Sequence, residues 1–395
     1  MKPRSDPKDL MVLEELTLNA KQIQDDVLEE ILTLNANTEY LRGFLHGSSD
    51  KELFKKNVPV VSYDDLRPYI ERVANGEPSD VISGKPITQF ILSSGTSGGK
   101  QKIFPVNNKF FEDMTFLISL PSFIISKHIK NIQQGKTLSF LFARRKSTTP
   151  CDNKQAMYCH FLCGLFQRDQ VVSVAASFGS GLVGAITFLE KHWKEMCGNI
   201  RSGHVNLIEE ECREKSWKEY YGNKVPLISP LYTSSETMFG VNMDPLCKPE
   251  DVSYTFMPNM SYFEFLPAEE GNEGIIVDLV NVKLGGYYEP LITNYFGLHR
   301  YRMGDILQVS GFYNNAPQFR FVRRKNMVLS ITVEVTTEED ILKALNNATL
   351  ILKSSNLVLM EFTCYADVST IPGESLVILE DNVLARFFSD KPPLF

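Results

Sequence analysis

The sequence is organised around Phe90-Ile91-Leu92-Ser93-Ser94-Gly95-Thr96-Ser97-Gly98-Gly99-Lys100-Gln101-Lys102, with the strand-like lead-in Pro86-Ile87-Thr88-Gln89 before it. An apolar, partly β-branched run passes into a loop of small residues, and two lysines follow the loop. Glycines allow a backbone to approach an anion closely, successive N–H groups can point into the resulting concavity, and hydroxyl groups add further donors. The stretch therefore has the composition of a phosphate-binding loop.

Two other interpretations of this loop remain open on composition alone. It has the residues of a flexible linker or of a tight turn between strands. Its shortness and its place between two apolar segments argue against a linker between domains. It is not a Walker loop, because Lys100 is followed by Gln101 and the required glycine spacing is absent.

The composition is that of a globular protein with room for two or three domains: 395 residues, 43% hydrophobic and 23% charged. A net charge of -7 argues against a general nucleic-acid-binding protein, which needs a basic face. The first residues lack the apolar region of a secretory signal. Seven scattered cysteines predict reduced thiols in the cytoplasm.

One segment suggests a membrane-spanning helix, and another suggests a metal site. Val171–Leu189 carries no charge and is long enough to span a membrane, but its serines and glycines favour a buried helix, so we expect no membrane contact. Cys159, His160 and Cys163 suggest a metal site, but their spacing is not that of zinc ligands. We predict that Tyr158–Leu165 is instead a core helix.

Hydrophobic periodicity predicts the remaining elements. Helices are expected over Asp9–Phe44, Leu66–Ala74, Asn107–His128 with a break or kink at Pro121, and Glu338–Leu352. A short strand followed by a helix cap is expected over Pro59–Asp65, directly before the second of these helices. Strands are expected over Tyr262–Leu266, Gly274–Val280 and Ile306–Val309, within a strand-rich part at 225–325.

Three motifs in this order are more specific than any one alone: the Ser93–Gly99 loop, Tyr232-Thr233-Ser234-Ser235-Glu236, and Tyr301-Arg302-Met303-Gly304-Asp305. With the flanking Phe321-Val322-Arg323-Arg324-Lys325-Asn326, they resemble the auxin-responsive GH-three family of plant acyl-acid amido synthetases, which form acyl-adenylates. The resemblance covers nearly the whole chain. It implies an α/β fold like that of acyl-adenylate-forming enzymes: a large N-terminal domain of mixed sheets and helices at 1–335, and a remnant of a small α+β C-terminal domain at 336–395.

The resemblance also implies a ligase that uses ATP and Mg²⁺. A small auxin-, jasmonate- or benzoate-like carboxylic acid would be adenylated, and an amino acid would then attack to form an amide. The developing phosphate charge requires hydrogen-bond donors and a cation. The implied nucleotide-binding residues are Ser93, Ser94, Gly95, Thr96, Ser97, Gly98, Tyr232 against the adenine, Thr233, Ser234, Ser235, Asp305 on the ribose and Arg323, and Glu236 would bind Mg²⁺. Taken singly, Glu236 is better interpreted as a helix-cap carboxylate beside Ser234, and Asp305 as an ordinary turn residue before a strand.

The chain also departs from the family pattern. Thr233 replaces a glycine or alanine, Val335 replaces a hinge lysine, and Pro121 stands where a basic residue is expected near the acyl carboxylate. Relatives carry more sequence between Pro150 and Met157 and between His204 and Leu231. We expect only a stub of the C-terminal lobe and no counterpart of its lysine, so the catalytic residue is unknown.

Three hypotheses follow. The chain is a working amido synthetase, a monomer whose partners are a small acid and an amino acid. Alternatively, it is a catalytically impaired remnant, or an incomplete gene model, that binds nucleotide only. In the third, it is a non-enzymatic interaction protein that uses the Asp9–Phe44 helices. Pyrophosphate exchange separates the first two hypotheses, and nucleotide binding separates both from the third.

Overall fold

The computed structural model describes residues 7–93, 102–129, 132–140, 153–177, 179–203, 226–268, 275–325, 328–331, 334–337, 362–367, 374–379 and 383–387. The chain separates into two compact units, which we describe one at a time. The first comprises residues 1–128 and 227–326, and the second comprises residues 129–226 and 327–395. A domain boundary near residue 336 stays a prediction.

The first unit begins with five helices: α1 Pro7–Leu18, α2 Ala20–Asn35, α3 Glu39–Leu45, α4 Lys51–Asn57 and α5 Tyr63–Ala74. The prediction of helices over Asp9–Phe44 is confirmed. Between α4 and α5, the predicted short strand is reduced to a single bridge between Val61 and Tyr301. Helix α5 starts three residues before Leu66, because Ser62 and Asp65 form a capping box at its N-terminus.

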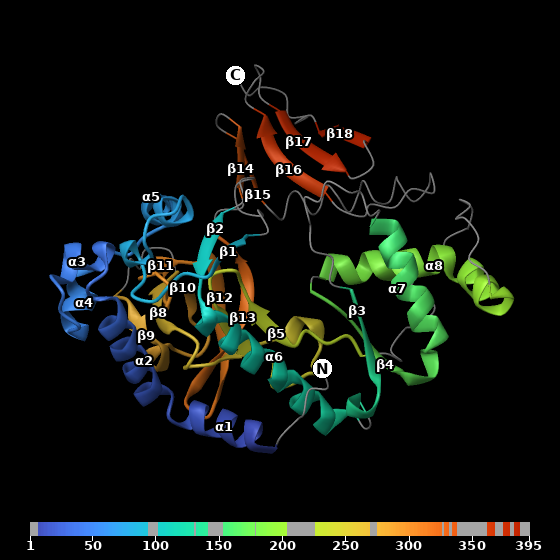
Figure 1. The fold of residues 1–395 in the computed structure, drawn as a ribbon, viewed down its shortest axis with the longest axis horizontal. Coiled ribbons are helices and arrows are strands. Elements are labelled where there is room, and N and C mark those ends of the chain that lie inside the picture. The colour runs from blue at the N-terminus through green and yellow to red at the C-terminus, as the bar shows by residue number, and fades with distance from the viewer. Residues whose placement is uncertain are drawn as a thin grey trace. The chain divides into compact units, whose positions relative to one another are not determined.

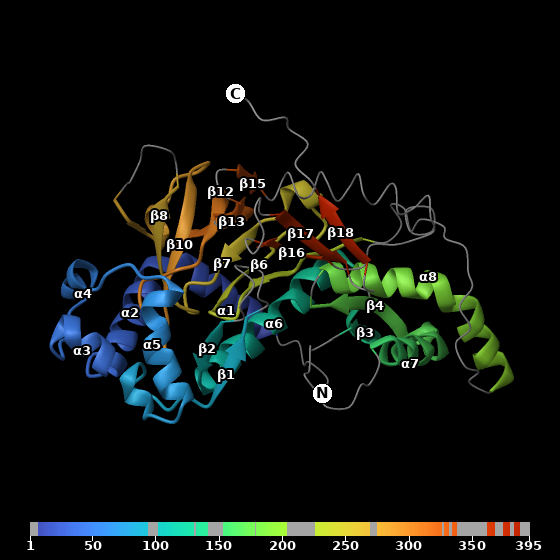
Figure 2. The same cartoon turned by 90° about the horizontal axis from the view of Figure 1, so that it is seen from above.

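A nine-stranded sheet forms the centre of this unit, with the strand order β5-β6-β7-β13-β12-β10-β8-β9 and β11 paired with β10 (Figures 1 and 2). All its pairings are antiparallel. The strands are β5 Leu231–Thr233, β6 Met238–Val241, β7 Tyr254–Phe256, β8 Tyr262–Pro267, β9 Val277–Asp278, β10 Tyr287–Thr293, β11 Tyr301–Arg302, β12 Asp305–Tyr313 and β13 Ala316–Arg324.

The predicted strands at 262–266 and 306–309 are confirmed within β8 and β12. Of the strand predicted over Gly274–Val280, only Val277–Asp278 forms one, β9. Ile275 and Ile276 lie before it, and after Asp278 the chain turns into the 3-10 helix Leu279–Asn281. Burial of Leu279, which is 1% exposed, favours this turn because it points an apolar side chain into the core.

Closely packed phenylalanine rings fill the sheet's core. Phe256 and Phe319 lie 4.5 Å apart between ring centroids, and Phe265 stacks on Phe319 at 4.9 Å. Helix α2 lies against β8, and α6 (Asn108–His128) lies against β5 and β6. The prediction at Pro121 was a break or a kink; helix α6 is continuous through Pro121, so a break is wrong, and a kink stays a prediction. Buried Leu117, Leu120 and Ile124 lie on both sides of the proline, and their packing outweighs the lost backbone hydrogen bond.

The small-residue loop connects the two strands of one hairpin. Strands β1 Gln89–Leu92 and β2 Ile103–Val106 pair antiparallel, with Leu92 opposite Ile103. At the loop's base the Ser93 N–H donates to the Lys102 carbonyl at 2.8 Å, and the Lys102 N–H donates to Ser93 Oγ at 3.0 Å. The loop is therefore internal to the first unit, which excludes the linker interpretation. Its residues Ser94–Gln101 lie outside the described residues.

The second unit contains a parallel strand pair, β3 Lys136–Phe140 and β4 Val171–Ala176, packed with α7 Asn153–Phe166 and α8 Gly179–Ser202. The prediction of one buried helix over Val171–Leu189 is therefore wrong. Its first third, Val171–Ala176, is rich in β-branched residues and forms β4, and the helix starts only at Gly179. In the part of the chain that the structure describes, no helix is long and apolar enough to cross a membrane.

The predicted helix over Tyr158–Leu165 is confirmed within α7, where Tyr158 and Phe161 face the core. Cys159 and Cys163 are exposed instead of lying in the core. Among the described residues, no group of three potential ligands could hold a metal ion.

The chain's last described part consists of a hairpin, β14 Val328–Ile331 with β15 Glu334–Thr337, and an antiparallel sheet of β16 Phe362–Asp367, β17 Glu374–Leu379 and β18 Val383–Phe387. The helix predicted at Glu338–Leu352 lies outside the described residues. Sheets and helices are mixed throughout, as the predicted α/β class requires.

Candidate functional site

Asp305 lies at the centre of the candidate site, at the start of β12. Its cross-strand partner in the sheet is Arg324, at the end of β13. Arg324 Nε donates to Asp305 Oδ1 at 2.8 Å, and Tyr232 Oη, from β5, donates to Asp305 Oδ2 at 2.6 Å. Asp305 is only 3% exposed. A buried carboxylate is thus held by a cation on one oxygen and a phenol on the other.

The surroundings of Tyr232 and Arg324 shift the pKa values of both side chains. Burial, and then the charge of Asp305, raises the pKa of Tyr232 well above its ordinary value, so the phenol remains a donor. Burial alone would lower the pKa of Arg324, but the neighbouring Asp305 raises it above the ordinary value. The phenol of Tyr232 therefore keeps its proton, and the guanidinium of Arg324 stays charged.

Glu236 lies in the turn between β5 and β6. Ser234 Oγ accepts hydrogen bonds from the backbone N–H groups of Glu236 and Thr237, at 3.1 and 3.3 Å, and Asn294 Nδ2 donates to the Glu236 carbonyl at 3.0 Å. The helix-cap interpretation of Glu236 is wrong, because this turn joins two strands. Burial raises the pKa of the Glu236 carboxyl, and the nearby charges of Arg324 and Lys102 oppose that effect.

This turn also meets the base of the small-residue loop. Ser235 Oγ donates to the Leu92 carbonyl at 3.4 Å, next to Ser93. Lys102, on the other side of the loop's base, contributes its charge to Glu236 and lies with its Nζ 5.3 Å from the ring centroid of Tyr63. The three sequence motifs therefore converge in one place, as expected if they serve one ligand.

Not every predicted residue joins this group. Ser94, Gly95, Thr96, Ser97 and Gly98 lie outside the described residues, so their predicted contact with phosphate stays a prediction. Thr233 and Arg323 are exposed. Arg323 pairs with Ile306 in the sheet, and successive strand residues point to opposite faces, so Arg324 reaches Asp305 instead.

Sequence reasoning missed a second ion cluster beside the site. Arg302 donates to Glu289 through Nε at 3.0 Å and through Nη2 at 2.5 Å, and Lys325 Nζ lies 3.2 Å from Glu289 Oε2. Burial opposes ionisation of Glu289, but the hydrogen bonds from Arg302 outweigh it and lower the pKa. Lys325 N–H also donates to the carbonyl of Gly304, which has φ +75°. This cluster braces the turn that presents Asp305.

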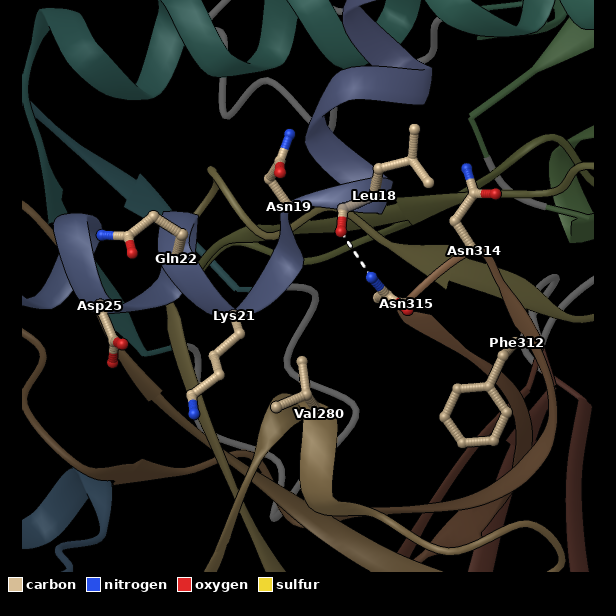
Figure 3. Close-up of a pocket in the computed structure, with 9 residues that line it drawn as sticks. All are labelled: Leu18, Asn19, Lys21, Gln22, Asp25, Val280, Phe312, Asn314 and Asn315. Carbon is tan, nitrogen blue, oxygen red and sulfur yellow. Dashed lines mark hydrogen bonds between the residues drawn. The ribbon is translucent and has the colours of Figure 1, made fainter.

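A cavity lies elsewhere in the first unit (Figure 3). It has a volume of about 760 Å³ and lies where α1 and α2 meet the β12–β13 turn, lined by Leu18, Asn19, Lys21, Gln22, Asp25, Val280, Phe312, Asn314 and Asn315. Asn315 Nδ2 donates to the Leu18 carbonyl at 2.5 Å across one edge of it. None of the predicted site residues lines this cavity.

Comparison with known proteins shows that family models and several characterised proteins match this chain. The chain matches the GH3 family N-terminal domain over residues 9–152 and 148–223, and the GH3 family central domain over residues 254–324. It is 47% identical over 459 aligned positions to the 4-substituted benzoates-glutamate ligase GH3.12 of Arabidopsis thaliana, covering 93% of this chain and 80% of that protein.

A second relative is the indole-3-acetic acid-amido synthetase GH3.15 of Arabidopsis thaliana, 41% identical over 483 positions, covering 96% of this chain and 81% of that protein. Among solved structures, AtGH3.15 acyl acid amido synthetase in complex with 2,4-DB matches with a TM-score of 0.79 and 42% identity, covering 100% of this chain and 84% of that one. Both sequence alignments are longer than the 395 residues of this chain, so these relatives carry internal segments that it lacks.

Proposed function

The chain belongs to the GH3 family, and from this premise we propose that it is an acyl acid amido synthetase that joins an amino acid to a small carboxylic acid at the expense of ATP. Its relatives are named for such reactions, with benzoates and indole-3-acetic acid as the acids. The observation that carries the proposal is that Tyr232 and Arg324 both bind the buried carboxylate of Asp305, with Glu236 near enough for its charge to act on both of them.

The proposed reaction has two steps. An oxygen of the substrate carboxylate bonds to the α-phosphorus of ATP, and the bond to pyrophosphate breaks. The amine nitrogen of the amino acid then bonds to the acyl carbon, loses a proton, and the C–O bond to AMP breaks. In both steps Asp305 would hold the ribose hydroxyls, and the charges of Arg324 and Lys102 would lie near the phosphates.

Glu236 fits the role of the Mg²⁺ ligand in this proposal. Mg²⁺ is usually held by one or two carboxylates together with substrate phosphates and waters, so a single protein carboxylate is sufficient. Burial disfavours the ionised carboxylate, and a bound cation would offset that cost. Bound there, Mg²⁺ would neutralise phosphate charge and orient the triphosphate.

We also propose a cellular compartment and an oligomeric state for the protein. Seven cysteines, an odd number, support a reducing compartment, and we propose that the chain acts in the cytoplasm as a monomer. The particular acid and amino acid are left to experiment.

ATP–pyrophosphate exchange tests this function directly. Purified protein would be assayed with benzoate-, indole- and jasmonate-type acids, with and without Asp305→Asn. We expect exchange that requires one of these acids and falls at least tenfold in the variant, the scale of a lost hydrogen bond to a charged group. Asp251→Asn is the matched control, because Asp251 is a surface residue with its side chain 59% exposed. Cooperatively folded protein without acid-dependent exchange would overturn the proposal.

A second candidate function is nucleotide binding without turnover. It is favoured by the segments that the relatives carry and this chain lacks. Calorimetry with ATP and AMP separates the two candidates. Nucleotide binding that is lost in Asp305→Asn, without exchange for any acid, would establish the second candidate in place of the first.

A further inference from the structure

The carboxylate of Asp305 accepts only about half of the hydrogen bonds that a carboxylate can accept. A carboxylate offers about four acceptor positions, two on each oxygen. One position on Oδ2 accepts from Tyr232 Oη at 2.6 Å, and one on Oδ1 accepts from Arg324 Nε at 2.8 Å. One acceptor position therefore remains on each oxygen. Two neighbouring free acceptors match the two O–H donors of a vicinal diol.

Tyr232 is itself held firmly. Its ring stacks on Phe239, with centroids 4.5 Å apart and planes 19° apart, and the rings of Tyr254 and Phe256 lie 5.7 and 6.1 Å away. A side chain fixed by its ring on β5 thus sets the position of a carboxylate on β12, more than seventy residues later in the chain. Arg324 holds the same carboxylate from the opposite oxygen.

We propose that Tyr232 is a positioning residue for nucleotide recognition: its hydroxyl fixes the rotation of the Asp305 carboxylate, so that the one free acceptor on each oxygen meets the 2′- and 3′-hydroxyls of a ribose. This inference rests on the proposed function. It differs from the predicted stacking of Tyr232 on adenine, because it assigns the hydroxyl, not the ring, a role in recognising the sugar.

The geometry makes a first prediction about the unmodified protein. If each oxygen of Asp305 offers one acceptor, loss of either ribose hydroxyl should weaken binding to a similar degree. Calorimetry with AMP, 2′-deoxyAMP and 3′-deoxyAMP measures this. We expect both deoxynucleotides to bind about tenfold more weakly than AMP. A loss confined to one of them would overturn the two-oxygen arrangement.

Tyr232→Phe tests the hydroxyl while it preserves the stacked ring. We expect this variant to bind AMP about tenfold more weakly but to bind 2′,3′-dideoxyAMP nearly as well as the parent protein does, so that discrimination between the two nucleotides largely disappears. A merely structural role of Tyr232 would weaken binding of both nucleotides equally. Tyr254→Phe is the matched control: its hydroxyl lies 2.6 Å from Ser229 Oγ, and we expect no change in discrimination.

The outcomes also separate this inference from the function on which it rests. Equal weakening for both nucleotides, or unchanged discrimination in Tyr232→Phe, overturns the positioning role and leaves the proposed function intact. Absence of any AMP or ATP binding by the folded parent protein overturns both.

Discussion

Arg300 and Glu264 form a buried bidentate ion pair across β8 and the turn before β11: Nε lies 2.9 Å from Oε2, and Nη2 lies 3.0 Å from Oε1. Arg300 also donates to the carbonyls of Lys55 and Val58, both at 2.9 Å. The guanidinium thus ties the segment around α4 to the sheet. Burial raises the pKa of Glu264, and Arg300 opposes that shift.

Glu264→Gln should therefore be strongly destabilising. It leaves the charge of Arg300 buried without its partner, and breaking such a pair costs about 3–5 kcal/mol of unfolding free energy. The measurement is chemical denaturation. Glu29→Gln is the control, because its pair with Lys51 is exposed, with side chains 67% and 35% accessible, and should contribute less than about 1 kcal/mol. Equal effects of the two substitutions would contradict the assigned burial.

Gly240→Ala should destabilise the sheet where β6 meets β7. A Cβ at Gly240 would lie 2.1 Å from the Thr255 carbonyl oxygen, so the two strands would have to separate. Overpacking of this kind typically costs about 1–3 kcal/mol or more. Gly43→Ala is the opposite case: a Cβ there meets nothing within 4 Å on helix α3, and stability should rise by up to about 1 kcal/mol. A lower melting temperature for both variants would count against this explanation.

The sequence was sufficient to predict the convergence of Tyr232, Glu236 and Asp305, because each belongs to a motif that a family resemblance connects. It was not sufficient for Arg324. Two adjacent arginines are equivalent in the sequence, and only the strand register, with Asp305 opposite Arg324, selects one of them. A bulge between Ile306 and Leu307 shifts that register and was not predictable from the pattern.

Long-range ion pairs and the structure of uncharged runs also could not be predicted from the sequence. Arg300 and Glu264 are 36 residues apart, and nothing local marks them as partners. Val171–Leu189 was predicted as one helix because periodicity alone does not distinguish a strand from a helix within an uncharged run. The change from β-branched residues to Gly179 was the signal that would have separated the strand β4 from the helix α8 within this run.

His299 should make stability depend on pH between about 7 and 5. It is fully buried, and burial lowers its pKa from 6.5 to about 3. The backbone of Ile82 slightly favours protonation, but neither ring nitrogen makes a hydrogen bond of acceptable geometry. Below pH 6.5 the unfolded state binds a proton that the folded state does not, so stability falls as the pH falls. At pH 5 the cost is about 2 kcal/mol, from 1.5 pH units at about 1.4 kcal/mol each.

Comparison with His299→Phe isolates this effect from other titrating groups. Unfolding free energies at pH 7 and pH 5 should differ by about 2 kcal/mol less in the variant than in the parent protein. Tyr40→Phe is the matched control, since the Tyr40 ring stacks on His299 with centroids 6.0 Å apart but burial raises the pKa of Tyr40 away from this range. An unchanged pH dependence in His299→Phe would show that the ring does not titrate as proposed.

Glu236 and Asp305 should respond differently to Mg²⁺. Under the proposed function, Asp305 acts on the ribose, so Asp305→Asn should weaken ATP and AMP alike, with or without Mg²⁺, by about 1.5–3 kcal/mol. Glu236→Gln should weaken ATP binding only when Mg²⁺ is present, and it should leave AMP binding unaffected, because AMP lacks the β- and γ-phosphates that bring the cation.

The pKa of Glu236 is raised by burial, so the Mg²⁺-dependent part of ATP affinity should also fall in mild acid, at a higher pH than for an ordinary glutamate. Calorimetry of the two variants in magnesium and in EDTA measures both effects, and identical, metal-independent losses would exclude Glu236 as the metal ligand.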